Sequence, residues 1–185
     1  MKIEDARKAY SAQLDVLRSQ KQTLTKLLKD SENNSGVRNF DRVEISRELA
    51  VVDAQYEATQ GVMEDIMARK MAIHNAEAAK QQGEVLAEAA DEMAKMMEIY
   101  RRIASGGEVP QKDEQRLMEY SKELYMAAKA AAMVKQGEGE KYDSVFEDEE
   151  QTEGETKDAS EIAGEAEIAV PAPEQVAEAA AAEIS

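Results

Sequence analysis

An apolar stripe that recurs in steps of three and four residues along positions 45–100 constrains this chain more than any other feature. Such steps place side chains on one face of an α-helix, whereas a half-buried strand alternates at every second residue. Seven of the first nine members are apolar, a pattern typical of a coiled-coil-like seam. These members are Ile45, Leu49, Val52, Tyr56, Thr59, Met63, Ile66, Lys70 and Ile73.

The stripe then passes through small residues before it reaches larger ones again. One extra step of three resembles the stammer that overwinds a coiled coil, but Gln81-Gln82-Gly83 could equally be a bend. Asp41 and, alternatively, Ser46 are candidate N-caps. We predict one helix over about residues 42–104, either continuous or bent near Gly83. The later members of the stripe are Ala76, Ala79, Gly83, Leu86, Ala90, Met93, Met97 and Tyr100.

Two shorter stripes predict helices before and after this long one. The first covers about residues 3–30, where polar residues such as Gln20 interrupt the apolar positions. The second covers about residues 110–135, with a kink if Ser121 caps a separate helix. Ser105-Gly106-Gly107 ends the long helix, because glycine readily takes the left-handed cap conformation.

Short connectors make neighbouring helices antiparallel, so the sequence predicts an all-α protein of long-helix hairpins. Residues 1–136 are expected to form this coiled-coil-like helical bundle. A two-helix hairpin buries little apolar area, and small cores are marginally stable. We therefore expect either a compact three- or four-helix bundle, bent at Gly83, or self-association.

The charge of the chain changes at Gly137. The formal net charge is −16, and residues 137–185 hold 16 acids and only two bases, so they carry −14 of it. Large apolar residues are too sparse there to offset the entropy of ordering the chain. We predict a disordered acidic tail over residues 137–185, with weak helix in its Ala-rich end.

The sequence holds no group of residues suited to catalysis. Cys is absent, which removes disulfides and thiolate metal sites, and His74 is the single histidine, so it has no second imidazole beside it. Neighbouring carboxylates such as Asp91 and Glu92 point about 100° apart on a helix and do not converge. We expect no enzymatic activity, cofactor, metal or small-molecule substrate.

Composition also narrows the class of partner. A near-neutral helical region and an acidic tail lack the basic face of a nucleic-acid binder. No run approaches the roughly 18 apolar residues of a membrane span, and the charged start of the chain does not resemble a secretory signal. We expect a cytoplasmic protein that binds a protein partner or a second copy of itself, and neither nucleic acid nor membrane.

Two features indicate where such binding occurs. Methionine side chains are adaptable and can line grooves for apolar helices, although packing within the chain or in a homodimer is the simpler explanation for their clusters. The tail has one apolar spot at the spacing of a helical anchor, which would dock in a basic groove, pack back on the helices or stay solvated. The candidate partner-binding residues are Met63, Met67, Met71, Met93, Met96, Met97, Tyr142, Val145 and Phe146.

Residues 40–46, Phe-Asp-Arg-Val-Glu-Ile-Ser, resemble the short segment at a helix start in flagellar anti-sigma factors. The helix-rich, acidic, Met-containing composition is also similar to that of secretion and flagellar export chaperones. The leading hypothesis is a bacterial scaffold or adaptor that acts through its apolar helical seams. The alternatives are a cytoplasmic chaperone that sequesters an amphipathic client helix, and a regulator whose acidic tail mimics nucleic acid.

Overall fold

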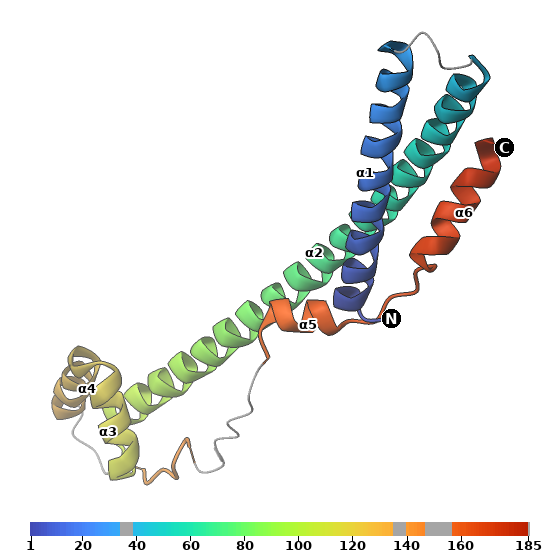
Figure 1. The fold of residues 1–185 in the computed structure, drawn as a ribbon. Coiled ribbons are helices and arrows are strands. Elements are labelled where there is room, and N and C mark those ends of the chain that lie inside the picture. The colour runs from blue at the N-terminus through green and yellow to red at the C-terminus, as the bar shows by residue number, and fades with distance from the viewer. Residues whose placement is uncertain (34–38, 135–139, 147–156, 185) are drawn as a thin grey trace. The chain divides into compact units, whose positions relative to one another are not determined.

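The computed structural model describes residues 1–33, 39–134, 140–146 and 157–184. These residues divide between two compact units, the first comprising Met1–Ala78 and Lys157–Ser185 and the second Ala79–Thr156. The prediction of an all-α protein with a long central helix is confirmed. The described residues form six helices, which are α1 (Ile3–Asn33), α2 (Asn39–Ala104), α3 (Gln111–Tyr120), α4 (Lys122–Val134), α5 (Ala159–Glu165) and α6 (Pro173–Ile184), as Figure 1 shows.

Helix ends lie where local signals in the sequence are strong. α2 ends two residues before Gly106, whose φ of 90° is the left-handed conformation that glycine adopts without steric cost. Ser121 separates α3 from α4 with an extended backbone, and its Oγ accepts a hydrogen bond from the Leu124 amide at 3.2 Å. The predicted kink and its capping serine are therefore confirmed.

α2 is one continuous helix from Asn39 to Ala104, so the interpretation of a bend near Gly83 is wrong. A glycine inside a helix costs about 1 kcal/mol relative to alanine. The residues on both sides of Gly83 are mostly Ala, Gln, Glu and Lys, which are good helix formers and carry the helix across it. The helix also begins ahead of both candidate N-caps, Asp41 and Ser46.

In the first unit, α1 lies antiparallel along the first part of α2 (Figure 1). Glu4 Oε2 lies 3.4 Å from Lys70 Nζ, and Lys21 Nζ lies 2.8 Å from Asp53 Oδ1. Contacts nearer the end of α1 therefore lie nearer the start of α2. The fully buried core residues between the helices are Ile3, Ala6, Tyr10 and Ile66.

The sequence analysis expects no packed structure in residues 157–184, and the structure differs from that expectation. α5 and α6 pack on the first unit, where Ile3 N donates to the Ala166 carbonyl at 2.9 Å. Tyr10 Oη donates to the Pro171 carbonyl, also at 2.9 Å. Residues 137–139, 147–156 and 185 of the predicted tail lie outside the described residues.

The reason for this difference is the type of contact that the C-terminal residues make. Ala159, Ala163, Gly164 and Ala177 are buried, so small side chains let the chain approach the helices closely. Backbone hydrogen bonds to residues 1–3 add to this packing. A composition argument counts large apolar residues, and it therefore underestimates a segment that packs through small residues and its own backbone.

In the second unit, the last part of α2 packs with α3 and α4, and residues 140–146 complete the core. None of the helices in the described residues combines the length and the apolar character needed to cross a bilayer. The buried core residues of this unit are Met96, Ile99, Ile103, Leu117, Ala128 and Phe146.

Candidate interaction surfaces

Residues 140–146, which we call the aromatic segment, dock on the second unit through their backbone. Glu108 N donates to the Glu140 carbonyl at 2.8 Å, and Tyr142 N donates to the Glu108 carbonyl at 2.9 Å. These bonds form a short parallel bridge between Glu108 and Lys141. The connector between α2 and α3 therefore presents an edge that pairs with an extended peptide, which is a common mode of peptide recognition.

Asp113, in the first turn of α3, is the polar centre of this docking site. Its side chain is fully buried, and a buried carboxylate needs hydrogen-bond donors to offset its lost hydration. Ser144 Oγ donates to Oδ1 at 2.7 Å, and Val145 N donates to Oδ2 at 2.9 Å. Both donors come from the aromatic segment, so removing the segment would leave the carboxylate without these two bonds.

Three basic side chains surround the aromatic segment. The Arg116 guanidinium lies 3.9 Å from the centre of the Phe146 ring, and Lys95 Nζ lies 5.5 Å from the same centre. Arg102 lies 4.9 Å from the centre of the Tyr142 ring and donates from Nη1 to the Asp143 carbonyl at 2.9 Å. Cations at these distances are attracted to aromatic faces. Basic side chains of the same chain therefore lie around the aromatic segment where it packs.

Tyr142 occupies its place because residue 107 has no side chain. A Cβ at Gly107 would overlap the Tyr142 ring and would lie 3.0 Å from the Glu140 carbonyl oxygen. The Tyr142 hydroxyl donates to Glu140 Oε2 at 2.9 Å, and this hydrogen bond, with partial burial, raises the pKa of Tyr142. The ring is therefore held between Gly107 on one side and Arg102 near its face.

The structure brings the three candidate residues of the tail together at this site. Phe146 is only 5% exposed, Val145 packs against the core, and Tyr142 is partly buried. The segment is a bridge followed by a turn, so the helical-anchor interpretation is wrong. The spacing suggested a helix, but backbone pairing with Glu108 keeps the segment extended. Packing back on the helices is the alternative that the structure confirms.

The candidate methionines do not form one surface. Met96 is buried in the second unit and Met63 packs against the core of the first, which agrees with packing within the chain. Met97 is half-buried. Met67, Met71 and Met93 are exposed. A partner-binding role for the exposed methionines stays a prediction.

Between its two packed ends, α2 has a stretch where the apolar stripe is exposed. We call Ala79, Gly83, Leu86, Ala90 and Met93 the uncovered stripe, since all five are exposed. Leu86 is 70% exposed and Met93 is 55% exposed. By contrast, Ile73 packs against the first core and Met96 is buried in the second. The seam continues through residues that no described segment covers.

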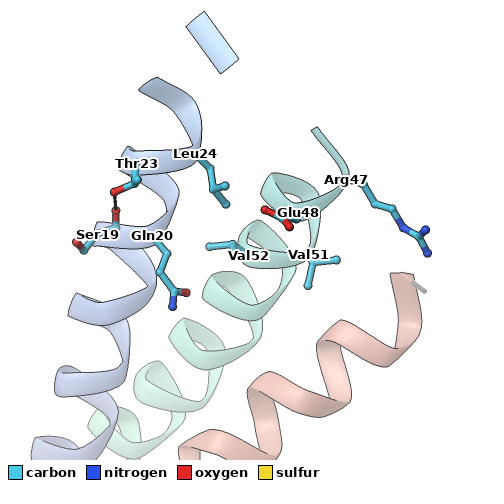
Figure 2. A pocket seen from close by; sticks show the side chains of 8 residues that line it. All are labelled: Ser19, Gln20, Thr23, Leu24, Arg47, Glu48, Val51 and Val52. Atoms are coloured by element: carbon cyan, nitrogen blue, oxygen red, sulfur yellow. Dashed lines mark hydrogen bonds between the residues drawn. The ribbon is translucent and has the colours of Figure 1, made fainter. Parts of the chain in front are cut away.

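A second open surface is a groove between α1 and α2 in the first unit. In Figure 2, Leu24 and Val52 point toward one another across it, while Arg47 points away. The volume of the groove is about 580 Å³. The sequence analysis missed this groove, and Gln20 is the signal that could have indicated it, because a polar residue in an apolar stripe marks a seam that is not closed. Its lining residues are Ser19, Gln20, Thr23, Leu24, Arg47, Glu48, Val51 and Val52.

Within the described part of the chain, no three His, Cys, Asp or Glu side chains lie close enough to hold a metal ion. No protein-family model, curated protein or solved structure matches the chain. Its function therefore has to be argued from these surfaces.

Proposed function

We propose that this chain is a non-enzymatic cytoplasmic scaffold or adaptor that associates with a second copy of itself through the uncovered stripe of α2. The single observation that carries the proposal is the exposure of Leu86 and Met93 on a stripe whose two ends are covered within the chain. Burying one such side chain contributes about 1.5–3 kcal/mol. A partner helix laid along the stripe would bury both.

The order of side chains in the stripe favours a second copy as that partner. Ala79 and Met93 each lie seven residues from Leu86, so an antiparallel pair centred on Leu86 places a large side chain opposite a small one at both ends. Gly83 and Ala90 lie between them and let the helices approach closely. Such an arrangement is a two-fold symmetric interface, the commonest kind in soluble oligomers.

The alternative, a chaperone that sequesters an amphipathic client helix, has support from a different surface. Met67 and Met71 are exposed on the first unit, and Met63 and Met67 line an open groove together with Arg7 and Asp15. A chaperone of this kind would be monomeric or loosely dimeric alone and would gain thermal stability when its client binds. A scaffold would instead form a defined homo-oligomer without any client.

Size-exclusion chromatography with light scattering tests the proposal. The full chain should have twice its chain mass of 20.4 kDa, and Leu86→Glu should return it to the single-chain mass by placing two carboxylates opposite each other. Val85→Glu is the matched control, because Val85 is 64% exposed and lies about 100° around the helix. A wild-type monomer, or equal effects of the two substitutions, would show that the stripe does not mediate association.

A further inference from the structure

We propose that the site around Asp113 also accepts the aromatic segment of a second copy, so that two chains can exchange residues 140–146. This inference goes beyond the association through α2, because it concerns a different surface of the second unit. It rests on the kind of contact that holds the segment in its own chain.

Backbone and side-chain hydrogen bonds hold the aromatic segment in its site. Asp113 accepts from a hydroxyl and a neighbouring backbone amide, and Glu108 pairs with the backbone on either side of Lys141. None of these bonds depends on how the segment is joined to α4. An identical segment that arrives from another chain can therefore form every one of them.

The site also contacts the side chains of the aromatic segment. Phe146 enters an apolar core and lies near two cations, Lys95 and Arg116. Four acids, Glu147 to Glu150, follow Phe146 in the sequence, and the segment itself is acidic. The site thus offers an apolar core for Phe146, basic side chains near its ring and the buried acceptor of Asp113. A second copy of the chain carries the same segment and therefore the groups that fit this site.

The chain's own aromatic segment and that of a second copy compete for the same site. Five residues separate Val134 at the end of α4 from Glu140, so the segment of the same chain is always near the site. A short covalent connection corresponds to an effective concentration of about millimolar. Exchange of an identical element changes few contacts and is a low-cost route to a dimer. The segment of a second copy should therefore bind strongly only where the chain's own segment is weakened.

A labelled peptide spanning residues 138–150 tests whether the site accepts the segment from outside. Measured by fluorescence anisotropy, the full chain with Phe146→Ala should bind it about 100-fold more tightly than the wild-type chain, whose site is already occupied. Adding Asp113→Asn to that variant should abolish binding. A peptide with Ser144→Ala should bind about 10-fold more weakly, because it lacks the hydroxyl that Asp113 accepts from.

Phe146→Ala removes a core residue, so a second variant guards against loss of structure. Ser144→Asp keeps Phe146 but places a carboxylate against Asp113, and it should release the segment and permit peptide binding in the same way. If both variants keep their helical circular dichroism and neither binds the peptide, the proposal is overturned. Equal binding to the Asp113→Asn double variant would overturn it as well.

Mixing two defective chains tests whether the donor is a second copy. One chain carries Asp113→Ala and keeps its segment, the other carries Phe146→Ala and keeps its site, and both carry Leu86→Glu so that the α2 stripe cannot associate them. Only the mixture should show a species of twice the chain mass in light scattering. If the peptide binds but the mixture stays monomeric, exchange between copies is overturned.

Discussion

Replacing Gly107 with alanine should release the aromatic segment from the second unit. A Cβ at this position would overlap the Tyr142 ring and would lie 2.9 Å from its Cδ2 atom and 3.0 Å from the Glu140 carbonyl oxygen. Ordinary contacts of a Cβ atom start near 3.4 Å. The steric conflict is therefore with the segment itself. The left-handed backbone conformation lies at Gly106, so Gly107→Ala adds no backbone strain of that kind.

The free-energy cost of Gly107→Ala depends on how far the Tyr142 ring can move. Overpacking a well-packed site costs about 1–3 kcal/mol. Tyr142 is only partly buried and can swing toward solvent, which places the cost near the lower end, at about 1–2 kcal/mol. Such a cost lowers the ratio of docked to undocked segment by roughly 5- to 30-fold.

Hydrogen exchange at single amides measures this ratio directly. The Glu108 and Tyr142 amides both form the bridge to the segment, so their protection should fall by roughly 5- to 30-fold in Gly107→Ala. Gly61→Ala is the matched control, because a Cβ there meets nothing within 4 Å. It should leave both amides unchanged while it stabilises α2 by about 0.5–1 kcal/mol. Unchanged protection in Gly107→Ala would refute the reasoning.

Two further predictions concern the first unit. Tyr10→Phe removes the hydrogen bond to Pro171 and should lower the free energy of unfolding by about 0.5–1.5 kcal/mol. Tyr10→Ala also opens a cavity and should lower it by about 3–5 kcal/mol. Chemical denaturation measures both changes. The pKa of Glu165 lies below its ordinary value of 4.5, chiefly because of Lys157 and then Lys2. The ion pair with Lys2 joins α5 to the start of the chain, so its contribution to α5 docking is complete above pH 4.5 and is lost as the pH falls below that value. Glu165→Gln should therefore reduce the pH dependence of the α5 amide shifts in NMR spectra, and equal pH profiles would contradict this assignment.

Helices α1 to α4 could be predicted because their causes are local. Steps of three and four apolar residues indicate these helices, and Gly106 and Ser121 end or separate them through local chemistry. The bend at Gly83 was a local ambiguity, because a single glycine is compatible with either conformation. The summed helix propensity of many residues on both sides of Gly83 favours the continuous helix.

The docking site could not be predicted, because its parts come from distant segments. Lys95, Arg102 and Arg116 lie on two helices among acidic neighbours, so no basic run marks the groove in the sequence. Asp113 reads as a favourable acid at a helix start. Only the fold shows that it is buried and that Ser144 donates to it. Tyr142, Val145 and Phe146 could be singled out as apolar, but their non-helical conformation follows from the bridge to Glu108 and the turn after it.

The aromatic segment and residues 157–184 both pack on the helices and add to two small cores. Removing them should therefore lower the stability of the chain, whereas removing a solvated tail should not. Phe146 completes the second core, and Ile168 and Val176 pack against the first. Loss of one buried aromatic alone costs about 3–5 kcal/mol, so a chain that ends at residue 136 should unfold at lower temperature than the full chain in calorimetry. If the tail did not pack on the helices, the full chain and the shortened chain would unfold at equal temperatures. Because Ile73 packs against the first core and Met96 is buried in the second, the uncovered stripe is the stretch of seam between them that is left for another chain.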